Sequence, residues 1–350
     1  MGARTAVTRY TPVMPGSPPS VSVLLPARDA AATLPAALRS LRRQTFPDWE
    51  CIVVDDGSRD GTCGAVAAVT AEDPRVAAVS IPPAGVVGAL VIGLARCRGR
   101  YVARMDADDV MRRDRLARQV AALEAAPGLA AVGAHVRFFP RRAMTDGLRA
   151  YERWLNGIDS PARVRAEAFV ECPVAHPTLM VRRAALSVFG YRDRGWPEDY
   201  DLVLRLLAAG HEIGVVPRRL VAWRDAPARL TRTHPAYALG QITACKAAFL
   251  ADGLLGGGEH YILWGYGGTG RALHRALQRH GKRPSHIVEV HARRLGHVIQ
   301  GAPVVAPDAL ATLPKGRLVA SVAGATARRQ IRRFLAALGW VETRDFVCAA

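Results

Sequence analysis

The sequence predicts an α/β protein in which a domain built on a mostly parallel sheet is followed by a smaller α/β domain. Three observations support this prediction. Short apolar runs alternate with helical patterns through the first third of the chain, which is typical of a parallel sheet covered on both faces. Two of these runs end in acidic clusters. A glycine run at residues 256–258 precedes a second strand–turn–helix pattern that begins at residue 261.

The alternation is regular enough to assign elements. Strands are predicted at residues 21–26, 50–54, 76–81, 100–105, 130–138 and 178–182. Helices are predicted at residues 31–43, 62–71, 85–97, 114–126, 200–209 and 237–251. Residues 140–171 show no clear period. In open sheets of this kind, ligands bind beyond the carboxyl ends of the strands, so the polar residues at those ends are the candidate site.

The composition shift suggests four segments. We expect a loose arm over residues 1–19, a first domain over residues 20–252, a glycine-rich linker over residues 253–259, and a second domain over residues 260–350. The first residues contain no apolar core of the kind found in secretory signals.

Composition narrows the class of protein. No apolar run reaches the length of about 18 residues that a membrane span needs. The six cysteines form no Cys-x-x-Cys pair, which favours a reducing, cytoplasmic setting. The net charge of +18 comes almost wholly from arginines scattered over both halves, and no nucleic-acid-binding motif accompanies them. We therefore expect no nucleic-acid partner, while peripheral membrane association stays open.

The first acidic cluster is Asp55-Asp56, followed by Gly57 and Ser58. A plain turn would explain these residues equally well, because all three residue types favour turns. Carboxylates at the end of a strand could also accept hydrogen bonds from the base and ribose of a nucleotide.

The second cluster is Asp106-Ala107-Asp108-Asp109, directly after a predicted strand. Three carboxylates in four residues repel one another unless a cation or hydrogen bonds offset them. Mg²⁺ and Mn²⁺ prefer oxygen ligands and often bridge to substrate phosphates. The alternative is ordinary acidic charge at a helix N-terminus.

The third cluster is Glu198-Asp199, which precedes a predicted helix. Acidic charge at a helix start explains it in part. A carboxylate beside aromatic residues and partly shielded from water could instead have a raised pKa and act as a general base.

The order of these motifs resembles that of the family 2 glycosyltransferases. The resemblance rests on VSVLLPARD at residues 21–29, LRSLRRQTF at 38–46, IVVDDGS at 52–58, RMDADD at 104–109, AHPT at 175–178 and PEDYDL at 197–202. It covers the chain from about Pro19 to Leu250.

The resemblance implies a GT-A fold and roles for individual residues. Donor binding would fall to Pro26, Arg28, Asp29, Asp56 and Asp106, although the family usually has Asn at the position of Asp29. Asp106 and Asp108 would bind Mn²⁺ or Mg²⁺, and Asp199, with Glu198 beside it, would be the catalytic base. His176, Arg224 and Arg232 are weaker candidates for the site.

The activity implied is inverting transfer of a sugar from a nucleotide-sugar to an acceptor. A uridine diphosphate sugar is the commonest donor in the resembling family. A saccharide or a lipid-linked acceptor reached from the cytoplasmic side would fit, as in the biosynthesis of cell-surface polysaccharides.

A second glycine motif opens the C-terminal segment. Gly265, Gly267 and Gly270 form Gly-x-Gly-x-x-Gly between a predicted strand at 261–264 and a helix at 271–280. Glu289 closes the next strand, at 286–290, where an acidic residue could meet a ribose. The segment resembles the small nucleotide-binding domain that precedes some bacterial sugar acyltransferases. We expect a Rossmann-like unit about the size of one mononucleotide-binding half, whose glycines either bind a nucleotide or only tighten packing.

Three other functions remain open from the sequence. A nicotinamide-dependent oxidoreductase would use the C-terminal glycine turn but would leave the acidic clusters unexplained. A nucleotidyltransferase would also combine carboxylates, a metal and a nucleotide, but would release pyrophosphate. A binding module without catalysis would hydrolyse no donor.

Overall fold

The computed structural model describes residues 9–10, 17–227 and 229–350, so most of the expected N-terminal arm lies outside the described residues. The chain divides into two compact units. The first comprises Met1–Pro161, Val174–Asp193 and Arg205–Arg229, and the second comprises Ala162–Pro173, Arg194–Leu204 and Leu230–Ala350. The sequence analysis places a domain boundary in the glycine-rich linker at residues 253–259, and this boundary stays a prediction.

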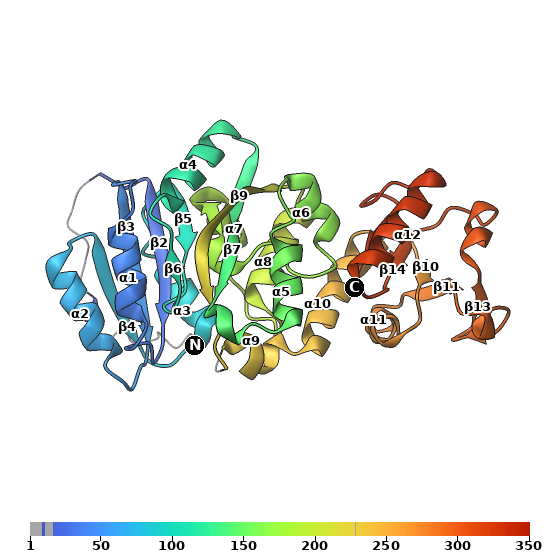
Figure 1. Ribbon diagram of the computed structural model, residues 1–350, viewed down its shortest axis with the longest axis horizontal. Helices are drawn as coiled ribbons and strands as arrows, with labels where there is room; N and C mark the ends of the chain where they lie inside the picture. Colours follow the sequence, from blue (N-terminus) through green and yellow to red (C-terminus); the bar gives the residue numbers. More distant parts are fainter. Residues whose placement is uncertain (1–8, 11–16, 228) are drawn as a thin grey trace, which may run out of the picture. The chain divides into compact units, whose positions relative to one another are not determined.

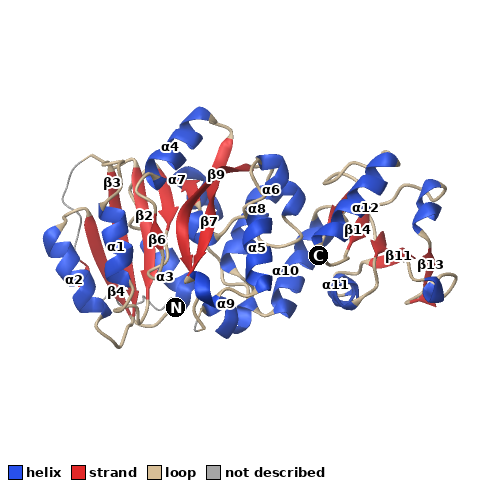
Figure 2. Ribbon diagram, in the orientation of Figure 1, coloured by secondary structure: helices blue, strands red, loops and turns tan. Residues whose placement is uncertain are grey.

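A nine-stranded sheet forms the centre of the first unit within the described residues (Figures 1 and 2). Its order is β1-β4-β3-β2-β5-β8-β7-β9-β6. The strands are β1 (Arg9–Tyr10), β2 (Val21–Ala27), β3 (Trp49–Asp56), β4 (Val76–Ile81), β5 (Tyr101–Arg104), β6 (Val110–Met111), β7 (Leu129–Phe139), β8 (Met180–Arg182) and β9 (Glu212–Arg224).

The sheet is parallel over four neighbouring strands, whereas β1 is antiparallel to β4 on one side of them and the pairing is mixed on the other. Strands β4, β3, β2 and β5 are parallel neighbours, as the strand–helix alternation predicts. Beyond β5 the pairing becomes mixed, since β8 is antiparallel to both of its neighbours and β9 is parallel to β7. The sheet is therefore less parallel than the sequence indicated, because the alternation ends near residue 126.

Helices cover both faces of this sheet. They are α1 (Leu34–Arg42), α2 (Thr62–Glu72), α3 (Gly85–Leu94), α4 (Arg115–Ala125), α5 (Asp146–Leu155), and α7 (Arg183–Phe189). Val23 and Leu25 of β2 share a buried cluster with residues of α1, α2 and α4. Leu24 points the other way, since a methyl group added to Gly93 of α3 would lie 2.4 Å from its Cδ1. This alternation fixes the register of the buried strand.

Helix α5 and strand β9 are among the elements that the sequence analysis did not assign, and the reason for each can be identified. Helix α5 lies in the stretch without a clear period and is capped by Thr145, whose side chain accepts a hydrogen bond from the Leu148 amide at 3.2 Å. Strand β9 contains Pro217, and proline usually argues against a strand interior. The register between β7 and β9 shifts at this point, between Ala134 and His135.

The parallel register brings the ends of several strands to one edge of the sheet. Ala27 at the end of β2 pairs with Asp55 of β3, and Asp56 pairs with Ile81 of β4. The Met105 amide donates to the Leu24 carbonyl at 3.1 Å, so the chain leaves β5 at the same edge. The loops that begin with Arg28, Gly57 and Asp106 therefore start side by side.

The second unit contains a six-stranded sheet in the order β12-β13-β11-β10-β14-β15. Its strands are β10 (His260–Trp264), β11 (Arg283–Val288), β12 (Val298–Ile299), β13 (Ala302–Val305), β14 (Leu318–Ala320) and β15 (Phe346–Cys348). All neighbours are parallel except β12 and β13. From β13 to β15 the order is that of the first five strands of a doubly wound nucleotide-binding sheet.

Helices lie on both faces of this second sheet as well. The helices of the unit are α6 (Pro161–Glu167), α9 (Leu230–Thr233), α10 (Leu239–Asp252), α11 (Gly268–Gln278) and α12 (Ala325–Ala337), with the first turns of α8 (Glu198–Ala208). One buried cluster joins Leu250 of α10 and Leu277 of α11 to one face. Another joins Leu335 of α12 to the opposite face. The unit is larger than the single mononucleotide half expected, because β14 and β15 extend the sheet beyond β10.

Within the described residues, no helix combines the length and the apolar character that crossing a membrane requires. The structure describes all six cysteines, and none of them forms a disulfide.

The turn after β3 requires glycine at position 57. Gly57 has a φ of +65°, and a methyl group on it would lie 2.6 Å from two ring carbons of Pro83. Both the left-handed backbone and the contact disfavour any other residue.

We expect Gly57→Ala to lower the free energy of unfolding by about 2 kcal/mol, measured by urea denaturation. Gly64→Ala is the matched control, because Gly64 lies in α2 with no described atom within 4 Å of an added methyl group. That control should be neutral or stabilising by up to about 1 kcal/mol. Equal effects of the two substitutions would contradict the role assigned to this turn.

Candidate active site

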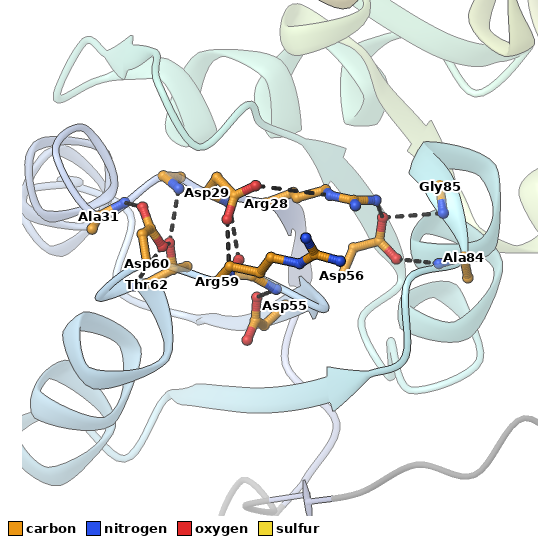
Figure 3. Close-up of polar contacts among 12 residues, drawn as sticks. Arg28, Asp29, Ala31, Asp55, Asp56, Arg59, Asp60, Thr62, Ala84 and Gly85 are labelled. Atoms are coloured by element: carbon orange, nitrogen blue, oxygen red, sulfur yellow. Dashed lines mark hydrogen bonds and ion pairs between the residues drawn. The ribbon is translucent and has the colours of Figure 1, made fainter.

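Asp56 links two loops at the carboxyl edge of the first sheet. Its Oδ1 accepts a hydrogen bond from the Ala84 amide, at 2.5 Å, and its Oδ2 accepts one from the Gly85 amide, at 3.0 Å (Figure 3). The Arg28 guanidinium approaches the same Oδ2 at 3.4 Å. Asp56 is 4% exposed, so its bonds to the two amides hold the end of β3 against the start of α3, and the exposed Arg28 contacts the same carboxylate.

Asp29 lies at the start of the loop after β2, with a φ of +47°. Its amide donates to Ser58 Oγ at 2.9 Å, and its Oδ1 accepts from the Arg59 amide at 2.8 Å (Figure 3). Asp55 accepts a hydrogen bond from the Ser58 amide at 3.2 Å. These bonds close the β2–α1 loop onto the β3–α2 loop. Arg28 and Asp29 remain exposed at this surface, while Pro26 is half-buried.

Asp106, Asp108 and Asp109 form a compact carboxylate cluster beyond β5. One carboxylate oxygen from each of the three lies within 4.8 Å of the other two. Asp106 forms an ion pair with the buried Arg104, and Asp109 is fully buried. The cluster is thus gathered by the fold, as well as by the spacing of its residues.

Burial and mutual repulsion disfavour the charged form of two of these carboxylates. Burial, followed by the charge of Asp106, raises the pKa of Asp108. Burial, followed by the charges of Asp106 and Asp108, raises the pKa of Asp109 well above its usual range. One oxygen of Asp109, Oδ2, finds no hydrogen-bond donor in the part of the chain that the structure describes.

Two buried arginines, Arg104 and Arg115, lie close to the cluster. Their positive charge does not bring the pKa values of Asp108 and Asp109 back to the usual range. Arg115 is fully buried, and its Nη2 donates to the Arg104 carbonyl at 2.7 Å. Burial lowers the pKa of Arg115 to about 9, so its guanidinium keeps its charge at neutral pH.

The donor set of the cluster fits a hard divalent cation. Such ions take carboxylate oxygens, and three of these converge here with one buried oxygen lacking a donor. A bound cation would favour the ionised carboxylates and so lower the pKa values of Asp108 and Asp109.

Two arginines complete the cluster, Arg224 at the end of β9 and Arg229 in the segment that follows it. The Arg224 amide donates to Asp109 Oδ1 at 2.7 Å, and Arg224 Nε donates to the Asp108 carbonyl at 2.8 Å. The charge of Arg229 lowers the pKa of Asp108, opposing the effect of burial. The sequence analysis gave Arg224 only as a weak candidate for the site. It did not assign Asp109 to the metal site, and it did not name Arg229. For Arg229 no local signal was available, because a single arginine after an unrecognised strand resembles any surface arginine.

Glu198 and Asp199 begin helix α8 in the second unit. Glu198 is 3% exposed, and its Oε2 accepts a hydrogen bond from the Tyr237 hydroxyl at 2.6 Å. Asp199 is half-buried, and its Oδ1 accepts one from the Tyr200 amide at 2.7 Å. Asp199 is thus the more accessible of the two carboxylates.

The remaining candidate site residues are distributed over both units. His176 belongs to the first unit, where its Nε2 lies 3.1 Å from the Tyr191 hydroxyl and its side chain is buried. Arg232 is an exposed residue of the short helix α9 in the second unit. The glycine turn Gly265–Gly270 joins β10 to α11, and Glu289 follows β11 directly.

Comparison with known proteins agrees with this geometry. The model of glycosyl transferase family 2 matches residues 22–189. The amylovoran biosynthesis glycosyltransferase AmsE of Erwinia amylovora is 30% identical over 207 residues, which cover 59% of this chain and 75% of that protein. The chain belongs to the family 2 glycosyltransferases, and it is therefore an enzyme of the glycosyltransferase class.

Solved structures share the fold at lower sequence identity. TarS of S. aureus in complex with UDP-GlcNAc aligns with a TM-score of 0.54 and 16% identity, covering 67% of each chain. A mannosyltransferase from Pyrobaculum calidifontis in complex with GDP-Man and Mn²⁺ aligns with a TM-score of 0.50 and 21% identity, covering 69% of this chain and 64% of that one. These likenesses confirm the predicted GT-A-type fold.

We expect Asp108→Asn to raise the melting temperature of the metal-free protein. The folded-state pKa of Asp108 is raised, so ionising this group above its ordinary pKa costs folding free energy that a neutral amide does not. The same variant should lose the increase in melting temperature that Mn²⁺ gives the unmodified protein. Both effects can be measured by differential scanning fluorimetry at pH 7 with EDTA or with Mn²⁺.

Asp73→Asn is the control of opposite sign. A hydrogen bond from Arg75 lowers the pKa of Asp73, and Arg75 Nη2 lies 2.8 Å from its Oδ2. This variant should melt at a lower temperature and keep the response to Mn²⁺. A lower melting temperature for metal-free Asp108→Asn would show that its carboxylate is already balanced within the chain.

Proposed function

We propose that this glycosyltransferase moves a sugar from a nucleoside diphosphate sugar to the hydroxyl of a saccharide or lipid-linked acceptor, with inversion at the anomeric carbon. The observation that carries the proposal is the cluster of Asp106, Asp108 and Asp109, in which burial and neighbouring negative charge raise the pKa of Asp109. A divalent cation would offset this negative charge and link the carboxylates to the diphosphate of the donor.

The donor would lie across the carboxyl edge of the first sheet. Arg28 and Asp29 are exposed at this edge, and Arg28 contacts the carboxylate of Asp56. We propose that these residues and Pro26 line the nucleotide pocket. Uridine diphosphate is the nucleotide we favour, and the complex of TarS with UDP-GlcNAc supports this choice.

The acidic cluster would hold Mn²⁺ or Mg²⁺ through Asp108 and Asp106, with Asp109 as a third candidate ligand. When bound, the cation supplies positive charge that stabilises the diphosphate leaving group. The Mn²⁺ in the complex of the Pyrobaculum mannosyltransferase supports this assignment. Arg229, whose charge already acts on Asp108, would add to the positive charge around the diphosphate.

We assign the general base to Asp199. The acceptor hydroxyl would give its proton to a carboxylate oxygen of Asp199 while its oxygen bonds to the anomeric carbon. The bond from that carbon to the diphosphate breaks in the same displacement, which inverts the configuration. Glu198 would position the start of α8 through its hydrogen bond with the Tyr237 hydroxyl.

We further propose that the enzyme works at the cytoplasmic face of the membrane. The amylovoran enzyme acts in the biosynthesis of a polysaccharide, which supports a role in assembling a cell-surface polymer. The surplus of 48 basic over 30 acidic residues would favour contact with an anionic lipid surface.

Incubation with nucleotide-sugars and Mn²⁺ tests the proposed reaction. We expect the enzyme to release a nucleoside diphosphate from at least one donor, slowly by hydrolysis and faster when an acceptor is supplied. EDTA should abolish the release, and the product should have inverted anomeric configuration by NMR. Release of pyrophosphate would instead identify a nucleotidyltransferase, and the absence of any product would point to a binding protein.

We expect Asp199→Asn to lower kcat by about 10²–10⁴-fold, because an amide cannot take the proton of the acceptor. Donor affinity, measured by calorimetry, should stay within about twofold, since Asp199 acts on the acceptor. Asp252→Asn is the matched control on an exposed residue at the end of α10 and should keep full activity. Turnover like that of the unmodified enzyme in Asp199→Asn would refute the assignment of the base.

A further inference from the structure

The glycine turn of the second unit lies where its sheet changes direction. Strand β10 lies between β11 and β14, and the chain reaches β14 only after completing β11 and β13. The Ser321 amide donates to the Trp264 carbonyl at 2.8 Å, so the first residue after β14 lies beside the end of β10. The loops after β10 and β14 thus flank the switch point, where open α/β sheets bind their ligands.

Packing within the chain explains only two of the glycines in this turn. Gly265 has a φ of +93°, and a methyl group there would lie 2.4 Å from Val322 Cγ2. A methyl group on Gly270 would lie 2.0 Å from the Gly265 carbonyl oxygen. Both positions are closed to larger residues by the fold itself.

Gly267 and Gly268 have no such explanation. A methyl group on either would meet no described atom within 4 Å, and Gly267 has an ordinary φ of −75°. These two residues precede and begin α11, whose first amides have no partners within the helix. Glycine here leaves the backbone open to a group from outside the chain, and a helix N-terminus favours an anion.

A buried hydroxyl gives a second, independent sign of a ligand. Ser321 is 2% exposed, and its Oγ has no hydrogen-bond partner among the described residues. Val319, two residues earlier, packs in the cluster on the α10–α11 face, so strand alternation directs the Ser321 side chain to that face. The Thr269 hydroxyl at the start of α11 donates to the Ser321 carbonyl at 3.1 Å, so Ser321 itself lies beside the first turn of α11.

Glu289 supports the turn. It is 5% exposed, and its Oε1 accepts hydrogen bonds from the Tyr266 amide and from Arg294 Nη1, both at 2.9 Å. Arg294 also donates to the Tyr266 carbonyl at 3.2 Å. The sequence suggests Glu289 as a ribose contact, which stays a prediction, and these bonds give it a further role in positioning the turn. Its carboxylate at the end of β11 would also disfavour a phosphate on the ribose 2′-oxygen.

We propose that this crevice binds the diphosphate of a nucleotide with an unmodified ribose, independently of the acidic cluster in the first unit. The Gly267 and Gly268 amides and the Ser321 hydroxyl hold the phosphates, and Glu289 and Arg294 keep the turn in shape. Backbone amides and a hydroxyl replace the metal, so binding here does not require a divalent cation.

The test uses the full chain carrying Asp108→Ala, in EDTA, so that the first site does not contribute. The probes are UDP, GDP, CDP, ADP and NAD⁺, titrated by calorimetry with inorganic phosphate as the reference. We expect one equivalent of at least one nucleotide to bind. Binding of a nucleoside diphosphate or of NAD⁺ supports the proposal and identifies the source of the diphosphate. No binding stronger than about 1 mM, or binding no tighter than that of phosphate, overturns it.

Gly267→Val in the same protein should weaken binding by about tenfold or more and lower the melting temperature only slightly, because its Cβ meets no described atom although valine is a poorer N-cap than glycine. Gly257→Val is the matched control, since an added methyl group at Gly257 also meets no described atom within 4 Å. Ser321→Ala should weaken binding by about tenfold without lowering the melting temperature of the ligand-free protein. Undiminished binding in both Gly267→Val and Ser321→Ala, or an equal loss in Gly257→Val, contradicts the site.

Discussion

The fold of the first unit holds three carboxylates together at the edge of a buried sheet, where burial disfavours the charged form of two of them. Strand β5 delivers Asp106, Asp108 and Asp109 to this edge, and Arg104 and Arg115 support them from the interior. This support is incomplete, because the pKa values of Asp108 and Asp109 stay raised. A site of this kind lowers the free energy of unfolding while no ligand is bound, and binding of a cation raises it again.

The loops around the cluster are held mainly by hydrogen bonds to backbone groups. Asp56 binds two amides of the β4–α3 loop, while Asp29 and Ser58 join the loops after β2 and β3. The exposed Arg28 therefore lies on a rigid edge, although it belongs to a loop. A rigid edge reduces the ordering that a bound nucleotide would otherwise require, which is the advantage of preorganisation.

Sequence reasoning succeeded where local pattern and tertiary structure agree. The strands that end at Asp56 and Arg104 were predicted from short apolar runs, and parallel packing then placed the acidic clusters at one edge. It failed at β9, where Pro217 interrupts the apolar pattern and the register with β7 shifts. Because β9 carries Arg224 and leads to Arg229, the positive side of the cluster was largely missed. The burial of Glu289 and its bonds to the turn also depend on tertiary packing and left no trace in the spacing of the motif.

The most direct test of the central claim is the position of a metal ion relative to the cluster. Crystals grown with Mn²⁺ and UDP, measured at the manganese absorption edge, locate the ion without reference to activity. We predict an anomalous peak at about 2.0–2.3 Å from carboxylate oxygens of Asp106 or Asp108, with the diphosphate completing its coordination. A diphosphate bound at this edge with no anomalous peak beside those carboxylates would contradict the account.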